Sequence, residues 1–513
     1  FFQNISERTQ LKMERRKSPR LAAKARPVYN ETALKNNVIE ETLPSAVSSI
    51  GSSKSVPESK YETGTNWVEG GIDSNIYFFG LIVVSPLLCQ VLAFLTSDQM
   101  TAEPYLTTLL PTCYADLYGC FHNILLSGLT AGAPTWEAAR FLLGFNIVAL
   151  FLEVFIPGKE ECGPETLTGH IPKYVDNGFR HCLVFSFLFY LGSNLGLANL
   201  YDFGIMYDVF FPCVTILNIF GLVFCVFLWY KGLHFPSTDD NGSSGSFLAD
   251  YLWGTELYPR CFGLDLKRFV NCRFSMTFWQ LAGLSFFYAS YKKHGEIDWG
   301  LLFGAISQYL YLCKFFWWEM GYMRSIDIIV DRAGFTIQWG CLVYVPAVYT
   351  LHSRFLVKHP SGLSPYLAGA IFVVSLSGVV LNYLADAERD TFRAANGKVK
   401  VWGKDPVFIK AQYTVVDPKT GQRKQRQSLL LASGFWGVAR HFQYLFELIA
   451  AWSWCILANP AKNGVIPLFY AAFLTALLIN RAKRDEAKCQ KKYGKYYDEY
   501  SKKVPYLIVP GVY

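Results

Sequence analysis

Five side chains suited to holding a polar ligand recur at the helical period where an apolar run begins. They are Trp436, Arg440, Gln443, Tyr444 and Glu447, which share one face if residues 433–448 form a helix. A cation, an amide, a phenol and a carboxylate are costly on one stripe of an apolar helix unless they line a cavity or meet a ligand. The pattern predicts a ligand site at the mouth of a membrane span. A polar seam between helices, or an arginine reaching lipid head groups, is the alternative.

A second stretch, residues 481–500, carries charged groups on one helical face and phenols on another. The first face holds Arg481, Asp485, Lys488, Cys489 and Lys492, and the second holds Tyr493, Tyr496, Tyr497 and Tyr500. Basic groups bind phosphates and aromatic rings offer stacking surfaces, so the two stretches together predict a nucleotide site.

Two arginines four residues apart, Arg389 and Arg393, share a face of the helix that continues beyond another apolar run. Paired guanidinium groups suit a 2′-phosphate or a pyrophosphate, which favours NADPH over NADH. Ordinary charge anchoring at the membrane surface is the alternative. The chain has no Gly-x-Gly-x-x-Gly fingerprint, so we expect any dinucleotide to bind outside a Rossmann domain.

Ten apolar runs must position these side chains. They cover residues 76–95, 135–155, 178–197, 206–229, 275–291, 301–318, 333–350, 364–384, 429–457 and 465–480. Hydrophobic residues make up 52% of the chain and charged residues only 17%. Runs of this length are typical of membrane spans, so we expect an all-α polytopic membrane protein with about ten transmembrane helices. Residues 105–129 form an insert that is interfacial or re-entrant.

The distribution of basic residues predicts which side the loops face. Residues 385–428 and the segment after 480 are basic, whereas residues 96–134 contain no Lys or Arg; Lys292 and Lys293 oppose the trend. Cytosolic loops carry an excess of Lys and Arg, so we place the 385–428 loop and the C-terminus in the cytosol. We interpret the net charge of +8 as topology, and we expect no nucleic-acid partner.

Shorter features complete the predicted organisation. Residues 399–402 and 408–415 read as strands, the second ending at a turn at 417–421, which predicts a small cytosolic β-hairpin between spans eight and nine. Residues 1–72 are polar and basic, which predicts a disordered cytosolic tail, with a docking or lipid-surface patch as the alternative. The sequence opens on Phe1, so we expect the natural chain to begin earlier. The remaining domain is residues 73–513, with the nucleotide bound by its 385–513 part.

Cysteine and histidine spacing argues against a metal site. The 13 cysteines include no Cys-x-x-Cys pair, and the 8 histidines include no His-x-x-x-His or His-Glu-x-x-His pattern. We therefore expect neither a metal centre nor a disulfide framework.

Several motifs resemble the sterol reductase family, which comprises Δ14- and Δ7-sterol reductases, sterol side-chain reductases and the lamin B receptor. GFWGVARHF at 434–442, RDEAKCQKKYG at 484–494 and VPGVY at 509–513 carry the resemblance, which covers roughly residues 76–513. KFFWWEMGY at 314–322 and DRAGF at 331–335 resemble the Δ7 branch most closely.

The resemblance implies a site for NADPH. Its matching positions are Arg389, Arg393, Leu431, Trp436, Gln443, Tyr444, Asp485, Cys489, Lys492, Tyr493 and Tyr500. Gln443 departs from the asparagine common in the family, and Arg389 from the lysine, so the hydrogen bond of the first and the geometry of the second stay open. The resemblance also implies a sterol substrate, membrane lipids and other sterol-biosynthesis enzymes as partners, and a multi-pass location in the endoplasmic reticulum membrane, continuous with the outer nuclear membrane.

Reduction of a sterol double bond needs a hydride on one carbon and a proton on the other, away from water. Tyr311, inside the 301–318 run, offers a phenol that is protonated at neutral pH. By resemblance, Tyr311 and Asp485 match the family's proton donor and its partner. An aromatic belt residue is the alternative for Tyr311. We interpret Glu319 and Asp331 as structural partners of Arg324 and Arg332.

The resemblance therefore implies NADPH-dependent reduction of the Δ7 double bond of a 7-dehydrocholesterol-type 5,7-diene. Three alternatives stay open: Δ14 reduction, a methyltransferase resembling the isoprenylcysteine methyltransferases, and a non-catalytic scaffold resembling the lamin B receptor. The methyltransferases share the C-terminal Arg-His pair but are shorter and lack the 314–343 block. The scaffold would carry a folded reader domain, for which residues 1–72 are too short and polar.

Overall fold

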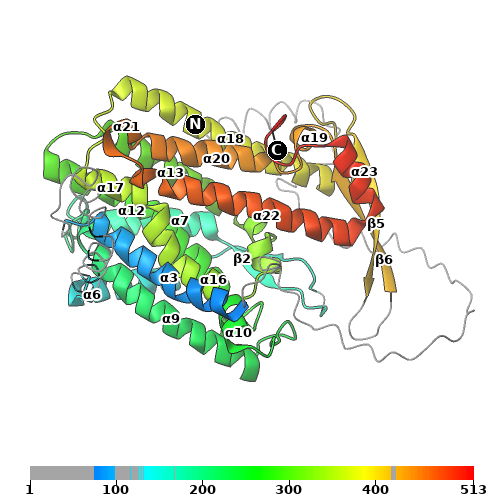
Figure 1. Cartoon of the computed structure of the whole chain (residues 1–513), viewed down its shortest axis with the longest axis horizontal. Coiled ribbons are helices and arrows are strands. Elements are labelled where there is room, and N and C mark those ends of the chain that lie inside the picture. The colour runs from blue at the N-terminus through cyan, green and yellow to red at the C-terminus, as the bar shows by residue number, and fades with distance from the viewer. Residues whose placement is uncertain are drawn as a thin grey trace, which may run out of the picture.

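The computed structural model describes residues 74–98, 132–166, 168–416 and 423–512, together with five isolated positions between 116 and 130. Helices dominate these residues, and the long ones run side by side (Figure 1). The predicted tail 1–72, most of the 105–129 insert and the 417–421 turn lie outside the described residues.

Every predicted apolar run contains a helix. In chain order the helices are α3 (Ser74–Leu95), α6 (Trp136–Phe155), α7 (Gly178–Gly192), α8 (Ile205–Asp208), α9 (Phe210–His234), α10 (Phe247–Trp253), α11 (Leu266–Arg268), η2 (Phe269–Met276), α12 (Thr277–His294), α13 (Trp299–Trp317), α14 (Glu319–Tyr322), α15 (Ile326–Ile329), α16 (Phe335–Trp339), η3 (Gly340–Tyr349), α17 (Leu351–Lys358), α18 (Pro365–Ala394), α19 (Phe435–Val438), α20 (Phe442–Ile456), α21 (Pro460–Asn463), η4 (Ile466–Leu468), α22 (Phe469–Tyr493) and α23 (Lys495–Lys503). Among the described residues, four helices are long and apolar enough to cross a membrane: Asn75–Leu95, Trp136–Phe155, Phe210–His234 and Pro365–Ala394. Helix length alone therefore does not establish ten spans.

Local sequence explains several helix boundaries. The side chain of Thr135 caps α6 by accepting from the Ala138 amide, and Asp298 caps α13 in the same way. Ser364 caps α18 and is followed by a proline, which suits the first helical position because it needs no amide donor there. Gly295 ends α12 in the left-handed conformation at φ 72°.

The predicted single helix over 433–448 is wrong. α19 ends at Val438, the cap residue Ala439 is extended (φ −149°, ψ 153°), and α20 begins only at Phe442. The amides of Arg440 and His441 donate to the carbonyls of Tyr506 and Leu507, at 3.0 and 2.8 Å. The helix is interrupted because the C-terminal segment supplies these backbone partners.

The predicted cytosolic hairpin exists as a hairpin, with a different partner strand. β5 (Phe408–Val416) pairs antiparallel with β6 (Arg423–Leu431), Phe408 lying opposite Leu431. Residues 399–402 form no strand, because Trp402 (φ 50°) and Gly403 (φ 79°) turn the chain within a single Val401–Lys404 bridge. β5 packs against α22 and α23, so the hairpin covers the C-terminal helices (Figure 1).

Two smaller hairpins lie elsewhere in the chain. β1 (Lys159–Cys162) pairs with β2 (Lys173–Asp176), and β3 (Arg260–Cys261) pairs with β4 (Leu264–Asp265), both antiparallel. Arg426 of β6 lies 3.0 Å from Glu165, so the β1–β2 segment and the β5–β6 hairpin meet.

Polar contacts between distant segments form two sets. One set joins Lys293 to Asp98, Lys292 to Asp202, Arg354 to Thr96 and His294 to the Val357 carbonyl. The other joins Arg268 to Glu319, Arg481 to Asp327, Arg484 to Asp331 and Arg426 to Glu165. If the ten predicted runs cross a membrane in alternating directions, the segments joined within each set lie on the same side of it. The two lysines that opposed the charge trend are each paired with an aspartate.

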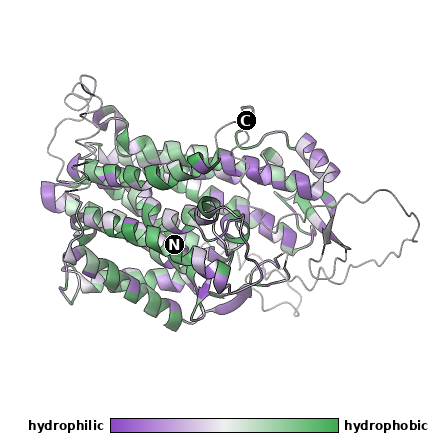
Figure 2. Cartoon of the chain, turned by 60° about the horizontal axis from the view of Figure 1, so that its bottom comes forward, coloured by the Kyte–Doolittle hydropathy of each residue, from purple (hydrophilic) through white to green (hydrophobic). Residues whose placement is uncertain are grey.

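The outside of the bundle is apolar. Leu143 on α6, Val223 on α9 and Val373 on α18 expose 62%, 64% and 61% of their surface. Hydrophobic residues colour the body of the bundle, and hydrophilic ones gather toward the hairpin end (Figure 2). Soluble proteins rarely expose apolar surface on this scale, so these helices suit a lipid environment.

Candidate active site

A cavity of about 1370 Å³ runs through the bundle between α13, α16, η3, α18, α20 and α22. Its polar end lies among the C-terminal ends of α18 and α22 and the start of α20. Its other end is lined by apolar side chains, including Leu81, Trp339 and Phe473. The cavity therefore joins a charged region to an aromatic, apolar one.

Most of the predicted site residues line this cavity. They are Tyr311, Arg389, Arg393, Gln443, Tyr444, Asp485, Cys489, Lys492 and Tyr493. Residues from four helices, far apart in the sequence, thus come together in one place.

Leu431, Trp436 and Tyr500 are not among the lining residues. The Arg389 guanidinium lies 3.9 Å from the centre of the Trp436 ring, and the indole nitrogen donates to the Ala385 carbonyl at 2.8 Å. The Tyr500 hydroxyl lies 3.4 Å from the Trp436 carbonyl, and Leu431 packs in the same small core. These three residues therefore lie outside the cavity lining, and Trp436 packs directly against the lining residue Arg389.

The cationic end is built on two helices. α18 carries Arg389, which is 3.2 Å from Asp386, and Arg393 one turn further on. α22 continues past its apolar half and brings Lys488 and Lys492 to the same cavity. The buried Nε of Arg389 has no hydrogen-bond partner among the described residues, so part of this donor set is available to an anion.

Between the two ends, the cavity is lined by a phenol bonded to a carboxylate. The Tyr311 hydroxyl donates to Oε1 of Glu447 at 2.5 Å, and both residues line the cavity. The rings of Trp279 and Trp454 lie 5.6 and 5.3 Å from the Tyr311 ring. This part of the cavity is aromatic, which restricts water around the phenol.

Asp485, the predicted partner of Tyr311, lies elsewhere. Its Oδ2 is 3.8 Å from Nε2 of His441 and 3.8 Å from Sγ of Cys489. Asp485 follows the apolar half of α22 and so lies toward the polar end, whereas Glu447 is one and a half turns inside α20 and faces α13. The structure therefore gives Tyr311 the partner Glu447, and Asp485 lines the same cavity without a direct contact to Tyr311 among the described residues.

The segment between α14 and α16 forms one wall of the cavity and is tied to α22. Arg481 lies 3.0 Å from Asp327, and Arg484 lies 2.5 Å from Asp331. The predicted pairing of Asp331 with Arg332 is wrong, because α22 packs closely enough to supply Arg484 instead.

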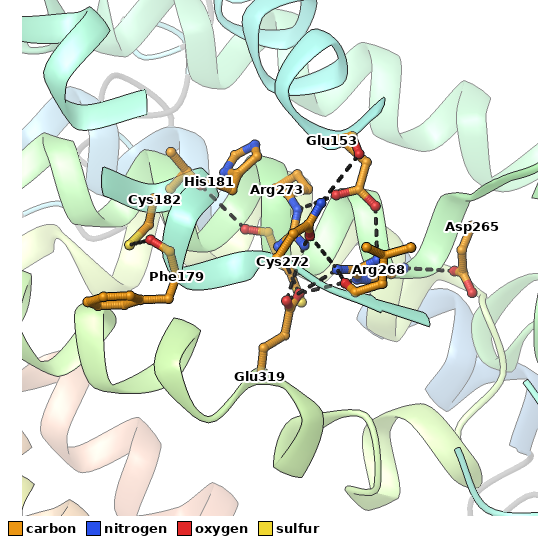
Figure 3. Close-up of polar contacts among 12 residues, drawn as sticks. Glu153, Phe179, His181, Cys182, Asp265, Arg268, Cys272, Arg273 and Glu319 are labelled. Atoms are coloured by element: carbon orange, nitrogen blue, oxygen red, sulfur yellow. Dashed lines mark hydrogen bonds and ion pairs between the residues drawn. The ribbon is translucent and has the colours of Figure 1, made fainter. Parts of the chain in front are cut away.

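Glu319 belongs to a buried network and not to a pair with Arg324. Arg273 and Arg268 approach its carboxylate at 2.7 and 3.2 Å, and both also contact Glu153 (Figure 3). Burial alone would raise the pKa of Glu319, but the two arginines lower it to about 2. The network ties α6, α11 and η2 to the start of α14. A Cβ at Gly178 would come within 2.3 Å of the same carboxylate, so a larger residue there would displace Glu319 from its arginines.

Comparison with known proteins decides the family. A model of the ergosterol biosynthesis ERG4/ERG24 family matches residues 74–513. The chain belongs to this family of sterol reductases. It is similar to 7-dehydrocholesterol reductase of Arabidopsis thaliana, with 40% identity over 384 residues, 74% of this chain and 86% of the relative. It is also similar to Delta(14)-sterol reductase of Methylotuvimicrobium alcaliphilum, with 36% identity over 382 residues, 74% and 84% of the two chains. A third relative, 7-dehydrocholesterol reductase of Xenopus laevis, is 32% identical over 399 residues, 74% and 81% of the two chains.

In this sterol reductase family member, Arg440 has a different place from the one its spacing predicts. It does not line the cavity and instead contacts Glu486 at 2.6 and 2.8 Å, together with the Val504 carbonyl at 2.6 Å. Burial alone would raise the pKa of Glu486, but hydrogen bonds from Arg440 and Tyr497 bring it below its usual value. Arg440 therefore fastens the C-terminal segment to α22.

The lining residues that the sequence analysis did not assign to the site include His441, Lys314 and Asn382. Lys314 donates to Asn382, which donates in turn to the Gln443 carbonyl at 2.9 Å. Lys314 opens the 314–322 motif and His441 lies in the 434–442 motif, so the sequence contained a signal for both. Asn382 carries no such signal, because a lone amide in an apolar run is common.

Proposed function

We propose that this chain reduces the Δ7 double bond of a 7-dehydrocholesterol-type 5,7-diene, using NADPH. The observation that carries the proposal is one cavity with a cationic end, an apolar aromatic end and the Tyr311–Glu447 pair between them. Family membership supports double-bond reduction. The 40% identity to a 7-dehydrocholesterol reductase, against 36% to a Delta(14)-sterol reductase, supports Δ7.

The cationic end fits a phosphorylated dinucleotide. Arg389, Arg393, Lys488 and Lys492 supply guanidinium and ammonium groups at one end of the cavity, and charge-assisted hydrogen bonds to phosphate are strong. Tyr444 and Tyr493 provide ring faces in the same region. The Trp436 ring packs against the Arg389 guanidinium, which holds the hydrogen-bond donors of Arg389 in one orientation. The coenzyme supplies the hydride when it is bound.

The protein supplies the proton. To donate a proton to a sterol carbon and stay uncharged, Tyr311 needs a protonated Glu447 beside it. A protonated Glu447 then gives its proton to Tyr311 as Tyr311 gives its own to the alkene. Glu447 is left as a carboxylate, and no charge remains on the phenol. A positioned general acid of this kind typically contributes about 10²–10⁴-fold to the rate.

The apolar end suits a flat ring system. Met276, Trp279, Trp339, Tyr349 and Phe473 line it, so a sterol would replace water against aromatic faces. A cation developing on the sterol as it is protonated would then be kept from water.

The proposal includes a topology of ten crossings, with the polar mouth in the cytosol of an endoplasmic reticulum membrane. The two separate sets of polar contacts support ten alternating crossings, because no described contact between loops joins one set to the other. The basic residues of the hairpin and of α22 support a cytosolic mouth.

Δ14 reduction is the second candidate, favoured by the similarity to Delta(14)-sterol reductase. The deciding experiment expresses the chain in cells that lack both sterol reductases and measures their sterols. Loss of the 5,7-diene supports the proposal. Loss of the Δ14 sterol alone assigns the other double bond, and no change in either sterol contradicts both. Purified protein with deuterated NADPH should place deuterium on one carbon of the reduced bond, and heavy water should place it on the other.

A further inference from the structure

Five proton-bearing side chains follow one another along the cavity. His441, Tyr444 and Glu447 are three residues apart at the start of α20, so they lie near one face of that helix. Asp485 of α22 lies beside the first, and Tyr311 of α13 lies beside the last. All five line the cavity, which therefore carries ionisable groups from its polar mouth to its aromatic interior.

At the polar end of this series, His441 contacts two of the other residues. The His441 and Tyr444 rings stack with centroids 5.2 Å apart and planes at 11°. Nε2 of His441 is 3.8 Å from Oδ2 of Asp485, and it makes no hydrogen bond among the described residues. The residue is only 5% exposed. A buried ring nitrogen without a hydrogen bond is costly unless a ligand or water meets it, and the cavity is the place where one could.

The acid proposed above must be restored after each turnover. One proton leaves Tyr311 for the sterol carbon, the Glu447 proton moves to Tyr311, and Glu447 remains as a carboxylate. The rings of Trp279 and Trp454 cover its partner Tyr311, so solvent protons reach the pair mainly through the polar end of the cavity. A second group that exchanges protons with the aqueous mouth would remove this restriction.

We propose that His441 resupplies this proton, an inference that rests on the proposed function. The imidazolium gives its Nε2 proton to the Glu447 carboxylate, and the neutral ring then takes a proton from solvent at the polar end. Six residues of helix separate the two groups by about 9 Å at 1.5 Å per residue, so water in the cavity carries the proton between them. His441 acts through Glu447 and touches no reacting atom.

The charges around His441 suit this exchange. Asp485 and Glu486 face it from α22, Arg389 faces it from α18, and Arg440 is its neighbour in the chain. Burial favours the neutral ring, as do the two guanidinium groups, whereas the two carboxylates favour the imidazolium. The carboxylates therefore offset part of the cost of charging a buried ring, which a relay through the imidazolium requires.

The test uses the full chain in membranes, with NADPH and the 5,7-diene. His441→Phe keeps a ring to stack on Tyr444 and removes the exchangeable proton. His441→Gln is the second variant, and His294→Gln is the matched control, because His294 lies with the opposite set of contacts, on the Val357 carbonyl. The measurements are kcat against pH, the solvent deuterium isotope effect, NADPH affinity by thermal shift, and kcat with added imidazole.

We expect His441→Phe to lower kcat by about tenfold or more, the lower part of the range for a proton-transfer group, with NADPH affinity unchanged. The isotope effect on kcat should rise, the limb of the pH profile that histidine causes should disappear, and imidazole should restore part of the rate. His294→Gln should match the parent protein.

Unchanged kcat and isotope effect in both His441 variants overturn the inference. Weakened NADPH binding without imidazole rescue also overturns it and makes His441 a coenzyme contact. If His441→Phe fails to fold, the same measurements on His441→Gln decide. A parent chain that reduces no sterol overturns the proposed function and this inference together, whereas an active parent with unaffected variants overturns only this inference.

Discussion

The hydroxyl of Tyr311 donates to Oε1 of Glu447 over 2.5 Å, which joins α13 to α20 across 136 residues of sequence. Both residues line the cavity, and the rings of Trp279 and Trp454 lie against the Tyr311 ring. When Glu447 is protonated, the phenol can pass its own proton to a substrate and be reprotonated by the same partner. The proposed two-residue acid therefore lies in the cavity, beside aromatic side chains.

Replacing Tyr311 with Phe should lower kcat by roughly 10²–10⁴-fold, the usual contribution of a general acid. NADPH binding should persist, because the ring and its packing remain. Glu447→Gln should cost a similar factor, and the double variant little more, since the two residues act as a unit. Tyr309→Phe, on the same helix but outside the cavity lining, is the matched control. A Tyr311→Phe protein that turns over at the parent rate would make Tyr311 a packing residue.

Replacing Arg393 with Ala should weaken NADPH binding more than NADH binding. A hydrogen bond to a charged group is worth about 1.5–3 kcal/mol, so the NADPH Kd should rise roughly 10- to 100-fold. Titration of the purified protein with both coenzymes measures this difference. Arg426→Ala is the control, because Arg426 contacts Glu165 outside the cavity. Equal losses for both coenzymes would contradict a phosphate clamp at Arg393.

Trp436 should affect the coenzyme without touching it. Trp436→Leu keeps an apolar side chain but removes the ring 3.9 Å from Arg389, an interaction worth about 0.5–2 kcal/mol. NADPH affinity should fall by the corresponding factor, while sterol binding stays unchanged. Adding Arg389→Ala should then remove most of the effect of Trp436→Leu, because the two residues act through one contact. Additive losses in this double-mutant cycle would place Trp436 in direct contact with the coenzyme.

Cysteine labelling should separate the two sets of polar contacts. In sealed microsomes, a membrane-impermeant thiol reagent should label a cysteine placed at Lys410, on the exposed face of β5, and spare one placed at Lys293. Detergent should make both react. Labelling of both sites before detergent is added would contradict the ten-span topology.

Acid should weaken the buried network around Glu319. Its pKa lies near 2 in the folded protein against the usual 4.5, so its contribution to stability is complete above 4.5 and is lost as the pH falls toward 2. The thermal midpoint in detergent should drop through this window. Glu319→Gln leaves the two buried arginines with one carboxylate fewer. It should lower the free energy of unfolding by about 3–5 kcal/mol at neutral pH. Its midpoint should also depend less on pH; an unchanged pH dependence would show that other groups titrate in that window.

Much of the helical framework was predictable because apolar length and capping residues act locally. α3, α6, α13 and α18 begin within two residues of the predicted runs, and the extension of α18 carries Arg389 and Arg393 as expected. The run at 429–457 was not predictable as three elements. Its interruption depends on backbone contacts with Tyr506 and Leu507, which lie far along the chain.

By itself the sequence determined the class of the protein, its apolar runs and its charge asymmetry, and most of the site residues that it predicted line the cavity. These features depend on composition and on the spacing of residues along the chain, which need no tertiary contact. Only the tertiary structure decided which groups meet. It paired Tyr311 with Glu447, Asp485 with His441 and Asp331 with Arg484, and it moved Arg440 and Trp436 out of the cavity. Such pairings depend on the rotation and depth of helices packed against one another, and periodicity along one helix contains no information about its neighbour.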